Sequence, residues 1–310
     1  MAWPCRRSLW GDNLDAARTA YAAVANAIGE YEPVRMLIPE EAQEQARRLC
    51  GENVAMLPMP LDDSWCRDTG PLFIIDGRGG ILGTDWRFNG WGGKYHPHDR
   101  DAASAAAILR HLDIGCIPVP MVLEGGAIDI DGHGHLLASE ECLLNPNRNP
   151  GWRREEIERT LAAFLGIREV IWLDRGLYGD ETDGHVDNIA RFTPTGAVLL
   201  HFPGDENSPN RPAAEENERR LQATGQDVRR LPEPPLARDG NGRPLPRSYA
   251  NFYIGNDAVF MPAFGVAEDD RARGILAEMF PARRIICLPG NTLVTGGGNI
   301  HCITQQQPAP

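Results

Sequence analysis

The sequence predicts an α/β protein built from five ββαβ-like units that surround a common axis. Helix-like stretches, with apolar residues at helical spacing, alternate along the chain with short apolar runs typical of strands. Glycine-containing hairpin signals lie between these pairs. Chemically distinctive residues also recur at near-even spacing. Because a regular period marks repeated supersecondary units, we expect a single domain over 1–310 rather than two.

The first unit is predicted from its helix and strand patterns. A helix begins after Asp12, a candidate N-cap, and ends near Gly29. A strand over 34–38, a helix over about 40–50 and a strand over 54–59 follow.

The later units repeat the order hairpin, helix, strand. Helices are expected over 101–112, 152–165, 213–224 and 269–280. The strands that follow them are expected over 117–123, 170–173, 228–231 and 284–288. Hairpin turns are expected at 76–80, 131–134, 195–196 and 255–257. The segment 231–246 is rich in Pro, Gly and Arg, and we interpret it as a surface loop and a candidate lid.

Five polar residues or thiols interrupt apolar surroundings at the ends of the repeats. They are Asp68, Glu124, His185, Asn251 and Cys302, separated by 56, 61, 66 and 51 positions. Five units about an axis would bring these positions to one central pocket. The alternative is that this spacing arises by chance.

Composition excludes several classes of protein. The chain has 310 residues, of which 42% are hydrophobic and 24% charged, as in ordinary globular proteins. No apolar run approaches the ~18 residues of a membrane span, and no secretory signal follows Met1. Seven cysteines, an odd number, favour a reduced compartment, so we expect a cytoplasmic protein. The net charge of -12 argues against a nucleic-acid partner.

Cys302 follows a triple glycine, which is unusual for a cysteine in a core strand. Glycines such as Gly297 and Gly298 let backbone and ligand approach closely, and a reactive thiol needs a polarised, partly open site. Cys302 is therefore a candidate nucleophile. The alternative is a small buried side chain in a terminal strand, which describes most cysteines.

Carboxylates and an imidazole form the rest of the candidate site. Trp65 and Asp68 offer an indole face and a carboxylate for a cation, although the segment also fits a solvated turn. Glu124, directly before two glycines, is expected to orient an imidazole and favour its protonated form, or else to be a structural acid. If His185 starts an extended strand, it shares a face with Asp187. A lone H-x-D is usually structural.

Metal and cofactor sites have little support in the sequence. H-x-H pairs, which can ligate zinc, occur at 96–98 and 133–135, but in a Gly- and Pro-rich loop and a predicted hairpin tip. There is no P-loop, G-x-G-x-x-G or G-x-S-x-G motif. We expect no metal and no organic cofactor.

Together, a thiol, a histidine and several carboxylates fit attack on a planar cation such as a guanidinium, which stays charged at neutral pH. A cysteine protease would instead need backbone donors for an oxyanion. Five segments of the chain resemble those of the family of agmatine deiminases and bacterial peptidyl-arginine deiminases. They are DDSWCRDTGP, LEGG, GDETDGHVDN, SYANFYIGN and GGGNIHCITQQQP. This resemblance implies the five-bladed, pseudo-symmetric α/β propeller called the pentein fold.

The resemblance also implies roles for individual residues. Cys302 matches the nucleophile, His185 the general acid/base, Asp68 and Asp187 the guanidinium-binding carboxylates, and Glu124 the acid that orients the histidine. Further residues implied at the substrate, by the matching segments or by their place near the mouth, are Trp65, Asn251, Asp180, Glu181, Gly297 and Gly298.

The implied activity is hydrolysis of a C–N bond of a linear amidine. Agmatine would become N-carbamoylputrescine and ammonia through an amidino-thioether on Cys302, a step of putrescine synthesis and polyamine metabolism. The family suggests a homodimer. Deimination of free or peptidyl arginine, amidino transfer to an amine and a non-enzymatic binding propeller remain alternatives.

Substrate choice depends on groups at the mouth of the site. The acids Asp99, Asp101, Asp180 and Glu181 would favour the amine of agmatine, whereas Arg243 or Arg247 would favour a carboxylate.

Overall fold

Five α/β units surround the centre of the molecule in the computed structural model, which describes residues 1–309. In the second to fifth units the first two strands are antiparallel and the third strand runs parallel to the second. A helical segment connects the second and third strands, because parallel neighbours need a crossover connection. The predicted order of hairpin, helix and strand is confirmed.

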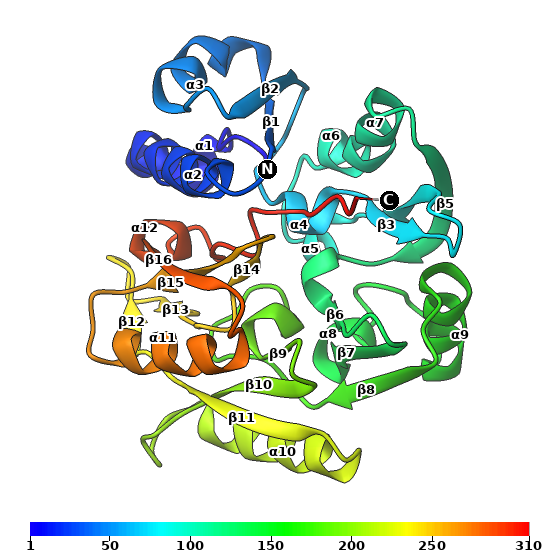
Figure 1. The fold of residues 1–310 in the computed structure, drawn as a ribbon, viewed down its shortest axis with the longest axis vertical. Coiled ribbons are helices and arrows are strands. Elements are labelled where there is room, and N and C mark those ends of the chain that lie inside the picture. Colours follow the sequence, from blue (N-terminus) through cyan, green and yellow to red (C-terminus); the bar gives the residue numbers. More distant parts are fainter. Residues whose placement is uncertain (310) are drawn as a thin grey trace.

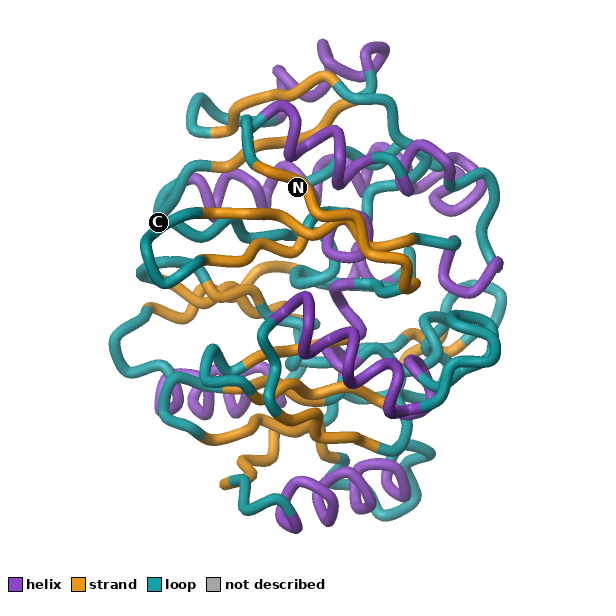
Figure 2. Tube along the Cα trace, turned by 90° about the vertical axis from the view of Figure 1, so that its right-hand side faces the viewer, coloured by secondary structure: helices purple, strands orange, loops and turns teal. Residues whose placement is uncertain are grey.

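The strands of the five units are β1 (Val34–Ile38) and β2 (Val54–Pro58); β3 (Leu72–Ile75), β4 (Ile81–Arg87) and β5 (Gly115–Val122); β6 (Ile128–Ile130), β7 (His135–Ser139) and β8 (Glu169–Leu173); β9 (Ala190–Phe192), β10 (Ala197–Phe202) and β11 (Asp227–Pro232); and β14 (Tyr253–Ile254), β15 (Ala258–Ala263) and β16 (Arg284–Pro289). The α-helices between parallel strands are α3 (Gln43–Leu49), α5 (Gly90–Gly93), α6 (Asp99–Ala102), α7 (Ser104–His111), α8 (Glu140–Leu143), α9 (Arg154–Leu165), α10 (Arg211–Ala223) and α11 (Glu268–Met279). In Figure 2 the strands of the different units follow one another from top to bottom, with helices at both ends.

The first unit differs from the other four in its pairing. Its strands β1 and β2 are parallel, and Ala2 forms a parallel bridge to Leu37 in β1. Helices α1 (Arg7–Trp10) and α2 (Leu14–Gly29) precede this unit. Apolar side chains of α2, β1 and the C-terminal segment around Ile300 belong to one buried cluster, so the two ends of the chain are packed together.

Short helical turns lead into the first strands of the middle units and meet at the centre. They are α4 (Cys66–Thr69), η3 (Gly125–Ala127) and η4 (Val186–Asn188). The turn α4 contacts η3, and η3 contacts η4. Residues in or beside these turns therefore converge although they lie far apart in the sequence.

Two local predictions are wrong. His185 does not start a strand, because Asp183 and Gly184 adopt positive φ values of 61° and 84° and turn the chain, and a single 3-10 turn follows before β9 begins at Ala190. The segment 231–246 is not a plain loop, since it contains the hairpin β12 (Ala237–Arg238) and β13 (Pro244–Leu245).

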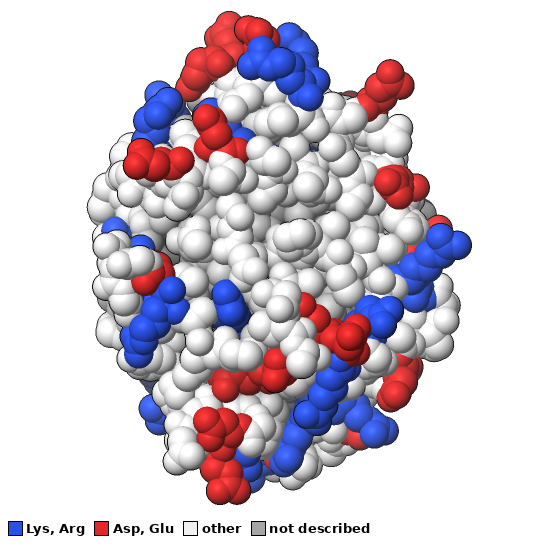
Figure 3. All heavy atoms as spheres, turned by 90° about the vertical axis from the view of Figure 1, so that its left-hand side faces the viewer, with Lys and Arg blue, Asp and Glu red and all other residues white. Residues whose placement is uncertain are grey.

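The charged surface residues are mixed in sign. On the face shown in Figure 3, Lys and Arg lie beside Asp and Glu, and much of the upper part carries neither. Within 1–309, no helix has both the length and the apolar composition needed to cross a membrane.

Candidate active site

Cys302 lies in a tight turn that follows α12 (Asn291–Val294), and only 6% of the residue is exposed. The preceding glycines allow this turn. A Cβ atom on Gly298 would lie 2.9 Å from Cys302 Sγ and 2.7 Å from the Trp65 ring, so a side chain at this position would displace the thiol or the indole. The local sequence thus places a thiol against an aromatic wall.

Asn251 holds the thiol segment in place. Its Oδ1 accepts hydrogen bonds from the backbone N–H groups of His301, at 3.0 Å, and Cys302, at 3.3 Å. Its Nδ2 lies 3.1 Å from Cys302 Sγ. Asn251 is fully buried and, like His185 and Asp187, is absent from the pocket lining, and its contacts are with the backbone and the thiol of the nucleophile segment.

Asp187 is the carboxylate nearest to the thiol. Its Oδ2 lies 3.4 Å from Cys302 Sγ and 2.8 Å from His301 Nδ1. Its Oδ1 is buried and has no hydrogen-bond partner. Burial raises the pKa of Asp187 to about 7, against the opposing effect of the Arg191 cation. The structure therefore offers a buried acceptor without a donor.

Asp68 is the second carboxylate at the thiol end of the site. Trp91 Nε1 donates to its Oδ2 and the Gly126 N–H donates to its Oδ1, both at 2.9 Å. Burial, and then the neighbouring Asp187, raise the pKa of Asp68 to about 8. Trp91 has φ 56° and ψ 51°, a left-handed conformation that is rare for a bulky residue and typical of strained functional sites.

His185 lies between two carboxylates without a hydrogen bond to either. Its Nδ1 is 3.8 Å from Asp68 Oδ1 and its Nε2 is 4.0 Å from Glu124 Oε2. Neither ring nitrogen has a partner. Burial lowers the pKa of His185 well below its ordinary value, and the Arg148 cation lowers it further. The expectation that Glu124 keeps this imidazole protonated is therefore wrong for the free site.

Glu124 is instead the counter-ion of a buried arginine. Arg148 Nε donates to Glu124 Oε1 at 2.7 Å, and both side chains are fully buried. The same guanidinium donates to Asp183 Oδ2 at 2.8 Å and to the Thr182 carbonyl at 2.9 Å. Arg148 thus joins the Glu124 turn to the loop that carries His185.

Gly126 marks the point where three of these side chains meet. A Cβ atom there would lie 2.6 Å from His185 Nδ1, 2.8 Å from Asp68 Oδ1 and 3.1 Å from Asp187 Oδ2. Only glycine leaves this space free.

A pocket opens above the thiol. Its lining consists of Leu9, Asp63, Trp65, Asp68, Trp91, Tyr95, Glu181, Thr182, Gly296, Gly297, Gly298 and Cys302. Of the residues expected at the substrate, Trp65, Glu181, Gly297 and Gly298 lie here. Asp180 does not, because it is turned inward and its Oδ1 accepts from the N–H and hydroxyl of Thr182.

Metal binding has one geometric candidate in the described part of the chain. Glu124, Cys142 and His185 each offer a donor atom, and these atoms lie within 4.8 Å of one another. Arg148 already neutralises Glu124, which disfavours a further cation there. In the hairpin, His135 pairs with Asp131 instead of with His133.

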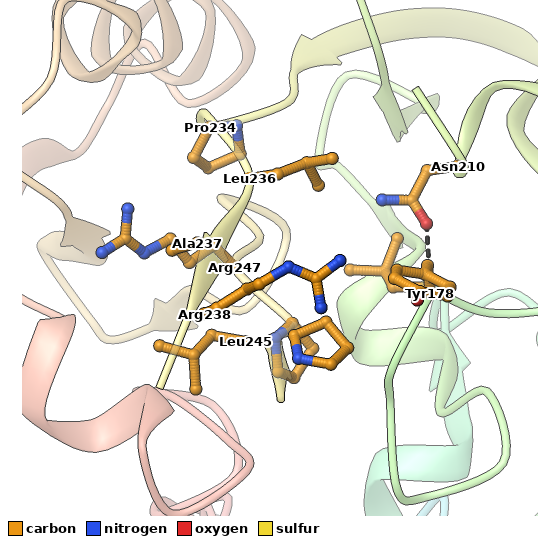
Figure 4. Close-up of a pocket in the computed structure, with 11 residues that line it drawn as sticks. Tyr178, Asn210, Pro234, Leu236, Ala237, Arg238, Leu245 and Arg247 are labelled. Carbon is orange, nitrogen blue, oxygen red and sulfur yellow. Dashed lines mark hydrogen bonds between the residues drawn. The ribbon is translucent and has the colours of Figure 1, made fainter. Parts of the chain in front are cut away.

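A second cavity, of about 170 Å³, lies under the hairpin β12–β13. Figure 4 shows Leu236 and Leu245 on one side and Tyr178 and Asn210 on the other. None of the five repeated positions lines it, so the chemistry lies in the pocket above Cys302.

Comparison with known proteins decides the family. A profile of the Porphyromonas-type peptidyl-arginine deiminases matches residues 1–308. The chain belongs to this family. It is 44% identical to the agmatine deiminase of Ectopseudomonas mendocina over 342 residues, covering 100% of this chain and 92% of the relative.

Solved structures confirm the pentein fold of this family member. An Enterococcus faecalis agmatine deiminase described as catalysing its reaction superimposes with a TM-score of 0.95 at 34% identity, covering 100% of this chain and 92% of that one. A substrate-bound variant of the C. jejuni agmatine deiminase gives a TM-score of 0.92 at 28% identity, with 98% and 91% covered.

Several residues of the site carry little signal in the sequence. Trp91, Tyr95, Arg148 and His301 all contact the central groups or line the pocket. The glycines on both sides of Trp91 were a usable signal, because a bulky residue between glycines suggests an unusual backbone conformation.

The geometry predicts an unreactive thiol in the free protein. Burial, followed by the charges of Asp187 and Asp68, raises the pKa of Cys302 well above its ordinary value. Alkylation of Cys302 by iodoacetamide, followed by peptide mass spectrometry, should be slow near pH 7 and still increase above about pH 9. The exposed Cys116 and Cys287 serve as internal references. A rate that levels off near pH 7 would contradict this environment.

Proposed function

We propose that the protein is an agmatine deiminase, a hydrolase that converts agmatine and water to N-carbamoylputrescine and ammonia. Relatives named agmatine deiminase match essentially the whole chain. The observation that carries the proposal is a thiol beside two buried carboxylates, of which Asp187 has an oxygen with no donor.

A guanidinium supplies what these groups lack. It is planar, permanently charged and able to donate N–H groups to two carboxylates at once. Asp187 Oδ1 and Asp68 would accept from its terminal nitrogens, while the indoles of Trp65 and Trp91 provide aromatic walls for the cation. The carbon would then face Cys302.

Binding also activates the nucleophile. The guanidinium brings a positive charge beside the thiol and offsets the two anions, so it opposes the main charges that raise the pKa of Cys302. The thiol proton passes to neutral His185, and Asp187 Oδ2, 3.4 Å from the sulfur, is the nearest group that can relay it. The thiolate adds to the guanidinium carbon and forms a neutral tetrahedral adduct.

His185 completes the proposed reaction by moving protons. It enters neutral, receives the proton released by the thiol and passes it to the departing nitrogen, so that ammonia leaves and a cationic amidino-thioether remains. Neutral His185 then takes a proton from water, and the hydroxide adds to the same carbon. Collapse breaks the C–S bond and forms the ureido carbonyl, and the hydroxyl proton passes to sulfur. His185 then loses to the solvent the proton that it took from water, so the thiol and the neutral imidazole are restored.

The aliphatic end of the substrate should meet Glu181. Three acids line the pocket: Asp68 at the thiol end, Asp63 paired with Arg6 at 2.7 Å, and Glu181. Glu181 is the half-exposed member, so it is the acid best placed to receive a terminal ammonium.

Two other acids that the sequence suggested at the mouth lie away from the pocket. Asp99 and Asp101, expected near the mouth, do not line the pocket, and Asp101 Oδ1 accepts from the backbone of Asp62 and Asp63. We also infer a cytoplasmic enzyme, because all seven cysteines are free in the structure, and we retain the homodimer that the family suggests as a proposal.

Product analysis tests the function directly. Wild-type protein should release ammonia from agmatine and form the ureido product without an acceptor amine, with far less release from free arginine and an arginyl dipeptide. Cys302→Ser should lose at least about a thousandfold in kcat because the covalent step is removed. Rapid release from arginine and none from agmatine would overturn the substrate assignment, and full activity of Cys302→Ser would overturn the nucleophile.

The pH dependence follows from the raised pKa values of the carboxyls. Asp187, at about 7, and Asp68, at about 8, are protonated below these values in the free enzyme, and only their anionic forms pair with a cation. Therefore kcat/KM for agmatine should rise as pH increases from about 6 to about 8. Circular dichroism at each pH controls for unfolding. A profile that is flat or falls over this range would contradict the raised pKa values.

A further inference from the structure

The acid at the pocket rim, Glu181, already has a cationic neighbour. Arg243 Nη1 lies 3.6 Å from Glu181 Oε1, and the Tyr95 hydroxyl donates to Glu181 Oε2. Lys94 Nζ binds the Glu181 carbonyl at 2.6 Å and Asp183 Oδ1 at 2.6 Å, so it anchors the loop rather than the Glu181 carboxylate. Arg243 is thus the arginine that faces this acid.

Arg243 is held in position by its own hairpin. It ends the turn between β12 and β13, where its N–H donates to Asp239 Oδ1 at 2.9 Å and its Nε donates to Asp239 Oδ2 at 2.7 Å. These bonds fix one edge of the guanidinium and leave Nη1 directed at Glu181.

The hairpin β12–β13 contacts the loop that leads into Glu181 at the pocket rim. A Cβ atom on Gly179 would lie only 2.2 Å from Pro244 Cγ, so backbone and ring are in close contact just before Glu181. The cavity of about 170 Å³ shown in Figure 4 adjoins this contact, because Leu177 and Tyr178 of the loop and Pro244 of the hairpin line it.

Two acids of the pocket therefore have counter-ions of different kinds. Asp63 and Arg6 form a buried pair at 2.7 Å, whose separation would leave an uncompensated charge. Glu181 and Arg243 are 48% and 61% exposed in their side chains and too far apart for a hydrogen bond. The second pair is weak and open to exchange.

We propose that Arg243 is a specificity-determining residue: it is the resident counter-ion of Glu181, and the terminal ammonium of the substrate takes its place. This inference rests on the proposed function and deepens it. A cationic substrate tail either displaces the Arg243 guanidinium from Glu181 or binds beside it against charge repulsion. Arg243 therefore raises the KM of such substrates without contacting the reacting carbon. No bond of the substrate is made or broken at this position.

The experiment compares Arg243→Gln with a matched control, Arg238→Gln, which removes a cation from the same hairpin. Arg238 bonds only the Gly242 carbonyl and makes no contact with Glu181. Each variant is assayed with agmatine and with 4-guanidinobutan-1-ol, whose tail is neutral. Thermal melting checks that each variant is folded.

For Arg243→Gln, KM for agmatine should fall roughly two- to fivefold, the range that an exposed ion pair supports, with kcat unchanged. KM for the neutral-tailed substrate should stay the same, and Arg238→Gln should resemble wild type with both. Arg243→Lys, which keeps the cation, should retain the wild-type KM. If Arg243→Gln melts early, Arg243→Met provides a second neutral variant.

The proposal is overturned if KM for agmatine rises or does not change in the neutral variants. An equal change with both substrates would also overturn it, because that result indicates a structural role of the hairpin. Wild-type turnover of agmatine tests the proposed function separately, so its failure is distinguishable from a failure at Arg243.

Discussion

The site depends on the cost of burying Asp68 and Asp187 near each other. Two carboxylates removed from water cannot both stay ionised without a cation, and the raised pKa values of about 8 and about 7 express this conflict. The same environment opposes ionisation of Cys302 and protonation of His185. The free site is thus close to neutral at its reactive atoms, and a guanidinium would supply the missing charge.

The pseudo-symmetric fold brings these polar groups together and provides some of them with hydrogen-bond partners. Asp68, Glu124 and His185 stand in or directly before the short turns that open three successive units, and these turns contact one another at the centre. Asp68 accepts from the Gly126 N–H of the next unit and from the Trp91 indole of its own unit, and Asn251 of the fifth unit bonds the thiol segment. Glycine is required where groups meet, since any side chain at Gly126 would occupy the space between the imidazole and both carboxylates.

The repeated units and the residues at their central ends could be predicted from the sequence. Hairpin turns and crossover helices depend on local signals, and the near-even spacing of polar positions reflects the repeat itself. The sequence alone did not reveal those parts of the site that depend on contacts between residues far apart in the chain. The pairing of Arg148 with Glu124 joins residues 24 positions apart, and the left-handed Trp91 aims its N–H at Asp68. The pKa directions follow from burial, which local patterns do not reveal, so the protonation expected for His185 was wrong.

The most direct test of this account is calorimetry of agmatine binding to Cys302→Ser near pH 7 in two buffers with different ionisation enthalpies. Because the raised pKa values leave protons on the carboxyls, a bound guanidinium should expel them, and the data should give a net release of protons to the buffer. Binding without proton release, or with uptake, would show that Asp68 and Asp187 are already ionised and that the substrate is not their missing counter-ion.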